Sequence, residues 1–144
     1  MKQADFFTVG YEGRSTGDLI AALRDAGIRL LLDIRHSAVS MYRPELSKRN
    51  FCELLAREGF EYLHVPQWGV PRAIRAQAIE AGTREPIWEW YDENVVASFV
   101  DLHSFMNGFE HPVALMCTEI DPHECHRHRL SLALEGMGLN GFDL

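Results

Sequence analysis

The chain has 144 residues, of which 47% are apolar and 24% are charged, so its composition is that of a globular domain rather than a disordered or fibrous protein. Lys and Arg number 14 against 21 Asp and Glu, and the formal net charge of −7 argues against a protein that coats nucleic acid or an anionic membrane through bulk positive charge. This length suits one domain, and residues 1–144 contain no repeat, low-complexity tract or linker that would divide them.

The first residues carry no long apolar core and no small-residue cleavage site, so no signal peptide is expected. No apolar run approaches the ~18 residues of a membrane-spanning helix, so no membrane partner is expected either. The cysteines are too few and too unevenly spaced for a disulfide framework. We therefore expect a cytoplasmic protein with free thiols at Cys52, Cys117 and Cys125.

The first part of the chain predicts a strand, a helix and a second strand. The apolar segment over residues 5–10 stops at a glycine and predicts a strand. Ser15 begins a capping-box-like start to a helix with one apolar stripe, and Gly27 stands where a left-handed C-terminal cap is expected. The nearly continuous apolar run within residues 28–34 is typical of a strand buried on both faces.

Strand and helix continue to alternate along the rest of the chain. After a polar stretch, Ser47 is a candidate N-cap. The elements expected from there are a helix ending at Gly59, a strand over residues 60–65, helices over 73–81 and 86–106, a strand over 113–117, a helix over 125–136, and a candidate edge strand over 142–144. This order predicts an α/β fold: a single three-layer domain with a mainly parallel sheet of four or five strands and helices on both faces.

Polar side chains follow each predicted strand. Right-handed crossovers bring the carboxyl ends of such strands to one edge of the sheet, where open α/β sheets bind their ligands. The residues expected at this edge are Gly10, Tyr11 and Arg14 from the first strand, Asp33 and Arg35 from the second, His64 from the third, and Cys117 and Glu119 from the fourth. We therefore predict a pocket there for a small anionic ligand or a nucleotide.

Cys117 has two interpretations. It ends an apolar strand and precedes a loop that runs into a helix rich in His and Arg, and such surroundings stabilise a thiolate that could act as a nucleophile. A free cysteine at the end of a core strand is also commonly a small buried hydrophobic residue.

The helical phase of the last helix sorts its polar residues. Its apolar stripe begins at Leu130, and counting back three and four residues places Arg127 and His126 on the inward face, whereas Cys125 falls away from it. Arg127 is then a candidate anion clamp at a helix N-terminus. The alternative is a purely structural pair between Arg127 and either Asp33 or Glu119.

Asp33 and Arg35 also have two interpretations: an ion pair that pins the following loop, or a substrate contact, with Asp33 orienting His64 or His126. The glycines around Tyr11 match neither a dinucleotide nor a P-loop fingerprint, so no cofactor is expected.

Cysteines and histidines crowd together near residue 120, but their spacing is not that of a compact zinc finger. A metal, if bound, would take Cys117, Cys125 and His126.

Four stretches of the chain resemble the domain of unknown function 488 family, and together they span nearly the whole sequence. They are residues 8–15, residues 32–35 with Ser40, residues 59–66 with Gly69, and residues 117–119 with Pro122 and residues 125–127. The resemblance implies an α/β fold and a set of motif positions, and it names no reaction. A looser fold-level analogy is to rhodanese-like domains, which also have an Asp-x-Arg after a strand and a strand-end cysteine.

The leading hypothesis for function is a thiol-dependent transferase or hydrolase. Cys117 would be the nucleophile, Arg127 the anion clamp, His126 or His64 the proton-transfer group, and Glu119 an orienting or acid-base partner. One alternative is a non-catalytic nucleotide or nucleic-acid binding module that uses Tyr11, Arg14, Arg35 and Arg127. A second is a Cys/His metal-binding protein.

Overall fold

The computed structural model of the chain describes residues 4–97, 104–109, 112–119 and 125–144. These residues form a five-stranded sheet in the order β3-β2-β4-β1-β5, with every neighbouring pair parallel. The strands are β1 (Phe6–Gly10), β2 (Leu30–Asp33), β3 (Glu61–His64), β4 (Val113–Cys117) and β5 (Gly141–Asp143). The predicted α/β class is confirmed, and the candidate edge strand at the end of the chain is β5, paired with β1.

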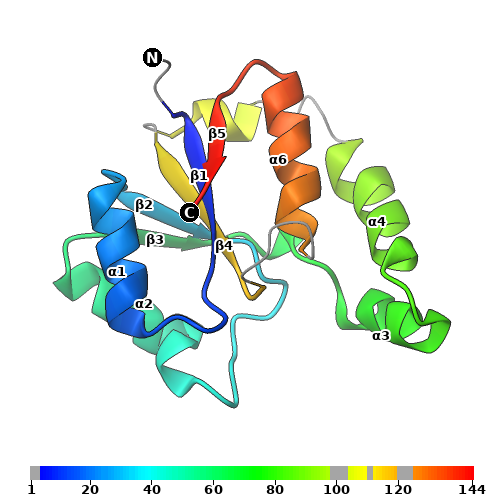
Figure 1. Cartoon of the computed structure of the whole chain (residues 1–144), viewed down its shortest axis with the longest axis horizontal. Coiled ribbons are helices and arrows are strands. Elements are labelled where there is room, and N and C mark those ends of the chain that lie inside the picture. Colours follow the sequence, from blue (N-terminus) through cyan, green and yellow to red (C-terminus); the bar gives the residue numbers. More distant parts are fainter. Residues whose placement is uncertain (1–3, 98–103, 110–111, 120–124) are drawn as a thin grey trace.

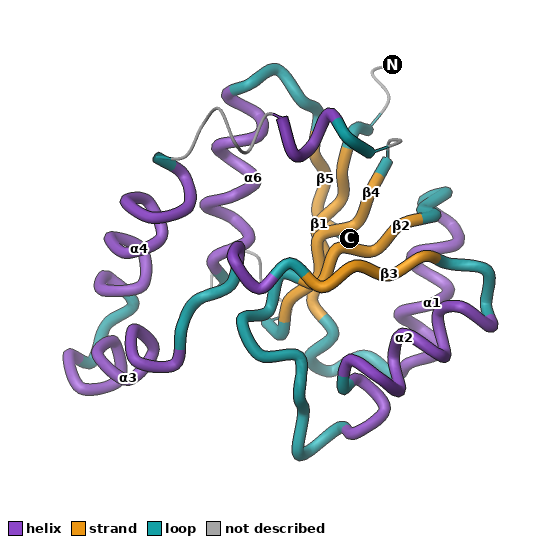
Figure 2. Tube along the Cα trace, turned by 180° about the vertical axis from the view of Figure 1, so that it is seen from behind, coloured by secondary structure: helices purple, strands orange, loops and turns teal. Residues whose placement is uncertain are grey.

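Helices cover both faces of the sheet (Figure 1). Seen also from behind in Figure 2, α1 and α2 lie on one side of the sheet, and α4 and α6 on the other, where α3 packs against α4. The helices are α1 (Thr16–Asp25), α2 (Lys48–Arg57), α3 (Arg72–Ala81), α4 (Glu85–Tyr91) and α6 (His126–Gly136), with 3-10 turns at Pro44–Leu46 and Pro66–Trp68. Within the described ranges, no helix combines the length and the apolar character that crossing a bilayer requires.

The sheet separates two apolar cores. Successive residues of a strand point to opposite faces, so Leu31 packs with α1 and α2 while Leu32 packs with α4 and α6. Both side chains have 0% exposure. This two-sided burial explains why the second strand is apolar at its first three positions rather than alternating.

Local signals set most of the helix ends. The Ser15 hydroxyl accepts a hydrogen bond of 3.0 Å from the Asp18 N–H, as the capping pattern predicts. Gly27 has a φ of 73°, the left-handed conformation expected after α1. Ser47 stands at the N-cap of α2, but its side chain makes no capping bond. Its hydroxyl accepts instead from the Ser40 N–H at 2.9 Å, because the loop before α2 folds back on itself.

The helix predicted over residues 86–106 is interrupted. After α4, the chain widens into a π-helical segment, Asp92–Val96. Residues 104–107 are helical again, and residues 98–103 lie outside the described part of the chain. Apolar periodicity alone does not distinguish a continuous helix from helical pieces that bury the same stripe.

Candidate functional site

The ends of four strands meet at one edge of the sheet, as predicted. Gly10, Asp33, His64 and Cys117 are the last residues of β1, β2, β3 and β4. The strand register places Gly10 beside Cys117 and Asp33 beside His64. Neighbouring parallel strands are about 4.8 Å apart, so groups at their ends lie within reach of one ligand.

Asp33 and Arg35 form a buried ion pair. The guanidinium donates from Nε to Oδ1 at 2.8 Å and from Nη2 to Oδ2 at 2.6 Å, with side chains 5% and 0% exposed. The Tyr62 hydroxyl donates to Oδ2 at 2.5 Å. Burial lowers the pKa of Arg35, but the bonds and charge of Asp33 outweigh it and raise that pKa. Burial and the Asp33 charge raise the pKa of Tyr62. Both carboxylate oxygens of Asp33 are thus hydrogen-bonded to groups of the protein, which favours an ion pair that pins the following loop over a substrate contact.

His64 and Arg14 stabilise the surrounding chain. The Nε2 atom of His64 lies 2.7 Å from the Arg35 carbonyl oxygen and so fixes the main chain of that arginine. Arg14 donates from Nη2 to the Leu144 carbonyl at 2.7 Å, beside the end of β5. Neither side chain lines the pocket found at the carboxyl edge.

That pocket has a volume of about 230 Å³ and lies between the strand ends and the start of α3. Its walls are Tyr11, Arg35, His36, Ser37, Val39, Val70, Arg72, Arg75 and Thr118. Tyr11 and Arg35 were candidate ligand-binding residues in the sequence. Arg72 and Arg75 were not, although their i, i+3 spacing at the predicted start of a short helix puts two cations on one helical face.

Positive charge dominates the walls of this pocket. Three of its residues are arginines and none is acidic. Arg75 donates from Nε to the Val70 carbonyl at 3.3 Å, and within the described part of the chain neither it nor Arg72 forms an ion pair with a carboxylate. The Nη1 atom of Arg35 is buried and has no hydrogen-bond partner among the described residues.

Tyr11 forms another part of the wall. Its hydroxyl lies 3.1 Å from Thr118 Oγ1, and the guanidinium carbons of Arg35 and Arg43 lie 5.4 Å and 5.6 Å from its ring centroid. The side chain is 8% exposed. The aromatic ring therefore holds two cations near the pocket through cation–π contact.

Cys117 and Cys125 are joined by a disulfide, so the expectation of free thiols is wrong for this pair. Their exposures are 1% and 2%, whereas Cys52 is exposed and free. The helical phase placed Cys125 away from the buried face because it assumed a helical backbone there. Cys125 is the N-cap of α6, with φ of −123° and ψ of 148°, and this extended conformation directs its side chain inward.

Arg127 lies beneath the cysteine pair with 0% exposure, and its predicted inward direction is confirmed. It donates from Nη1 to Cys117 Sγ at 3.0 Å and to the Glu119 carbonyl oxygen. A β-carbon at Gly10 would collide with that same carbonyl, so only glycine lets the chain after β4 pass so close to β1. The carboxylate of Asp33, one predicted partner of Arg127, is occupied by Arg35.

His126 is buried beside this group at 3% exposure, facing inward as predicted. Its Nε2 lies 3.0 Å from the Ile34 carbonyl oxygen, and its Nδ1 lies 3.6 Å from Cys125 Sγ. Burial lowers the pKa of His126 to about 4, and the neighbouring Arg75 and Arg127 lower it further against the Ile34 bond. The imidazole is therefore neutral at pH 7, and it donates from Nε2 to the Ile34 carbonyl.

Ligand atoms suited to a metal also meet at this place. The sulfurs of Cys117 and Cys125 and a carboxylate oxygen of Glu119 all lie within 4.8 Å of one another. His126 is not in this group, so Glu119 replaces it in the set of possible ligands expected from the sequence. Glu119 and His126 do line a narrow pocket of about 10 Å³ that reaches Arg84.

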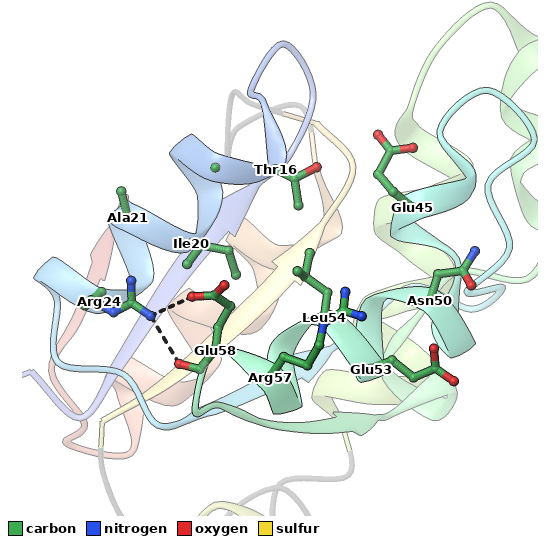
Figure 3. Close-up of a pocket in the computed structure, with 11 residues that line it drawn as sticks. Thr16, Ile20, Ala21, Arg24, Glu45, Asn50, Glu53, Leu54, Arg57 and Glu58 are labelled. Atoms are coloured by element: carbon green, nitrogen blue, oxygen red, sulfur yellow. Dashed lines mark hydrogen bonds and ion pairs between the residues drawn. The ribbon is translucent and has the colours of Figure 1, made fainter.

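A larger groove of about 800 Å³ lies between α1 and α2, away from the strand ends, and contains none of the candidate residues (Figure 3). Its walls mix both charges with apolar side chains, and Arg24 pairs with Glu58 at 3.0 Å within it. Opposite charges on one wall neutralise each other, so this groove has no preference for one sign of ligand.

In a comparison with known protein families, a family model described as "Domain of unknown function DUF488" matches residues 15–134. No curated protein and no solved structure matches the chain.

Proposed function

Because the chain belongs to the DUF488 family, a domain of unknown function, its activity has to be argued from its own side chains, and we propose that it binds a small phosphate-bearing anion in the arginine-lined pocket at the carboxyl edge of the sheet. The observation that carries the proposal is the charge of the walls. Arg35, Arg72 and Arg75 gather there with no acidic residue, in a chain whose net charge is −7.

Electrostatics support an anionic occupant. Like charges gathered in a cleft repel one another, and a cleft lined by one sign of charge concentrates ligands of the other sign. Arg72 and Arg75 also lie in the first turn of α3, where the helix dipole adds to the positive potential. An anion bound between them relieves the repulsion.

Hydrogen bonding supports a ligand with several acceptor oxygens. Arg72 and Arg75 offer charged guanidinium donors from the pocket walls, and a hydrogen bond to a charged group is worth about 1.5–3 kcal/mol. Ser37 and Thr118 offer hydroxyl groups from the same walls. Arginine suits phosphate because its planar guanidinium can donate two parallel hydrogen bonds.

The size of the pocket favours a small ligand. Its volume of about 230 Å³ lies below the roughly 300–1,000 Å³ of typical ligand pockets, so it suits a phosphate group with a small attached moiety rather than a dinucleotide. Tyr11 and Val39 supply the apolar part of the wall for such a moiety.

The experiment is isothermal titration of the purified chain with inorganic phosphate, adenosine monophosphate and a 5′-phosphorylated oligonucleotide. We expect phosphate or the mononucleotide to bind, with an affinity that falls as salt increases. The double variant Arg72→Ala/Arg75→Ala should bind at least about tenfold more weakly, since each lost charged hydrogen bond is worth about 1.5 kcal/mol or more.

The matched control removes two exposed arginines of α2, Arg49→Ala/Arg57→Ala, and so changes the net charge equally. Its affinity should stay close to that of the original chain. Equal affinity in the Arg72/Arg75 variant, or failure of all three probes to bind, would overturn the proposal. Tight binding of the oligonucleotide alone would replace it with the nucleic-acid alternative.

Thiol-dependent group transfer or hydrolysis at Cys117 is the second candidate. The contact of 3.0 Å from Arg127 Nη1 to Cys117 Sγ favours it, because a neighbouring cation stabilises a thiolate. Glu119 Oε2 lies 3.8 Å from the same sulfur. Cys117 is 1% exposed, so catalysis requires a movement that gives a substrate access to its sulfur.

Alkylation of the chain after reduction by a dithiol tests this candidate. Fast modification of Cys117 in the folded protein, at a pH well below the ~8.5 of a free thiol, would support a nucleophile. Modification that occurs only on unfolding would exclude it. Cys52, which is exposed and free, is the internal reference for unhindered reaction.

A further inference from the structure

The cysteine pair and Glu119 form a cluster that the anion pocket does not use. Their three ligand atoms lie within 4.8 Å of one another, and none of the three residues lines the pocket proposed to bind the anion. Two thiolates and a carboxylate are ligands that zinc prefers. We propose that the reduced chain binds one zinc ion through Cys117, Cys125 and Glu119.

The backbone is placed for an ion between the sulfurs. The α-carbons of Cys117 and Cys125 lie 7.5 Å apart, beyond the roughly 4.4–6.8 Å usual for a disulfide. Zinc–sulfur bonds of about 2.3 Å at a tetrahedral angle separate two sulfurs by about 3.8 Å, which accommodates a wider spacing of the α-carbons than a disulfide does. The end of β4 and the N-cap of α6 supply that spacing.

Arg127 completes the site electrostatically. Two thiolates and one carboxylate carry three negative charges, which the zinc ion and the Arg127 guanidinium together balance. Arg127 already donates to both sulfurs, from Nη1 to Cys117 at 3.0 Å and from its backbone N–H to Cys125 at 3.5 Å. Such N–H···S bonds orient metal-bound thiolates and lower their charge.

The two sulfur ligands are buried, whereas the carboxylate ligand is only partly buried. The cysteines are 1% and 2% exposed, while Glu119 is partly buried and lines the narrow pocket that reaches Arg84. Three protein ligands leave the fourth tetrahedral position of zinc to water or to another small ligand.

The disulfide and the zinc complex exclude each other. A dithiol reductant converts the disulfide to two thiols and is itself oxidised to its disulfide. Zinc then binds both sulfurs, and the two thiols release two protons to solvent. In the oxidised form neither sulfur is a thiolate, and no zinc is held.

The test is titration of the chain with Co²⁺, a spectroscopic substitute for zinc, before and after reduction by a dithiol that is then removed. We expect one Co²⁺ per reduced chain with a sulfur-to-cobalt charge-transfer band, displacement by Zn²⁺, and none of this in the oxidised chain. Glu119→Gln should weaken binding about tenfold or more, Cys125→Ser should abolish the band, and Cys52→Ser should change nothing.

If Cys125→Ser does not fold, a second measurement on the original chain still tests the proposal. Zinc should protect Cys117 of the original reduced chain from alkylation while Cys52 still reacts, and binding should release two protons per ion. The proposal fails if the reduced chain shows no one-to-one band, or if Cys117 is equally reactive with and without zinc. The Arg72→Ala variant should bind zinc normally, because Arg72 lines the anion pocket and not the narrow pocket beside Glu119, so this result is independent of the anion pocket.

Discussion

Arg35 and Arg127 are both buried near the carboxyl edge of the sheet, at 4% and 0% exposure, but they contact different kinds of group. Arg35 donates two hydrogen bonds to the oxygens of the Asp33 carboxylate. Arg127 donates to Cys117, whose charge depends on whether the sulfur is oxidised, protonated or bound to metal.

The comparison separates structural from functional use of one residue type. The buried ion pair of Arg35 with Asp33 holds the loop after β2. A buried cation beside sulfur stabilises whichever form of the cysteine carries negative charge. Burial alone does not reveal the role of an arginine; the chemistry of its partner does.

Removing the charge of Asp33 should have the largest effect on the free energy of unfolding. Asp33→Asn leaves Arg35 buried without its carboxylate, and we expect a loss of about 3–5 kcal/mol in the free energy of unfolding, measured by urea denaturation. Glu58→Gln, which breaks the exposed Arg24–Glu58 pair, is the matched control and should cost less than about 1 kcal/mol. Similar losses in the two variants would contradict the distinction between the pairs.

Lowering the pH should cause the next largest loss of stability, through His126 beside Arg127. Burial lowers the pKa of His126 to about 4 from its ordinary 6.5, so as the pH falls below 6.5 the unfolded chain takes up this proton first. The stability that depends on neutral His126 is present above pH 6.5 and is lost towards pH 4, by up to about 3 kcal/mol.

Urea midpoints measured between pH 7 and pH 4 check this expectation. His126→Gln keeps a donor for the Ile34 carbonyl and removes the titrating group, so its stability should depend less on pH than that of the original chain. The same dependence in both would show that His126 does not contribute.

The smallest expected effect is that of crowding the Arg127 contact. A methyl group at Gly10 would meet the Glu119 carbonyl and Arg127 Nη1, so Gly10→Ala should cost about 1–3 kcal/mol in urea denaturation. Gly17→Ala is a control that should change the stability in the opposite direction. Its new methyl group meets only Ser15 Oγ, at 3.9 Å in the exposed first turn of α1, and should stabilise by up to about 1 kcal/mol. Unchanged stability in the Gly10→Ala variant would mean that the chain after β4 can shift freely.

Much of the candidate site follows from the sequence because parallel strands end at a common edge. The apolar runs gave the strand ends, and these placed Asp33, His64 and Cys117 together. Helical phase turned His126 and Arg127 inward, and both are buried. Each of these inferences needed only local periodicity and a topological rule.

Other features depend on contacts that periodicity does not report. Arg72 and Arg75 belong to the pocket because α3 lies beside the loop after β2, a packing fixed by distant apolar contacts. His64 and Arg14 were expected at the pocket, but each bonds to a main-chain carbonyl elsewhere. The strand end fixes where a side chain leaves the backbone, and the neighbouring segments determine which group it contacts.

The sequence by itself determined the α/β class, the apolar strands and the inward face of the last helix, because burial imposes a period of 2.0 or 3.6 residues on the chain. Only the tertiary structure decided which polar groups are partners: Asp33 with Arg35, and Cys117 with Cys125 and Arg127. Hydrogen bonds and sulfur contacts need distances of about 3–4 Å, and such distances between β4 and the start of α6 arise only once both have packed on the same core.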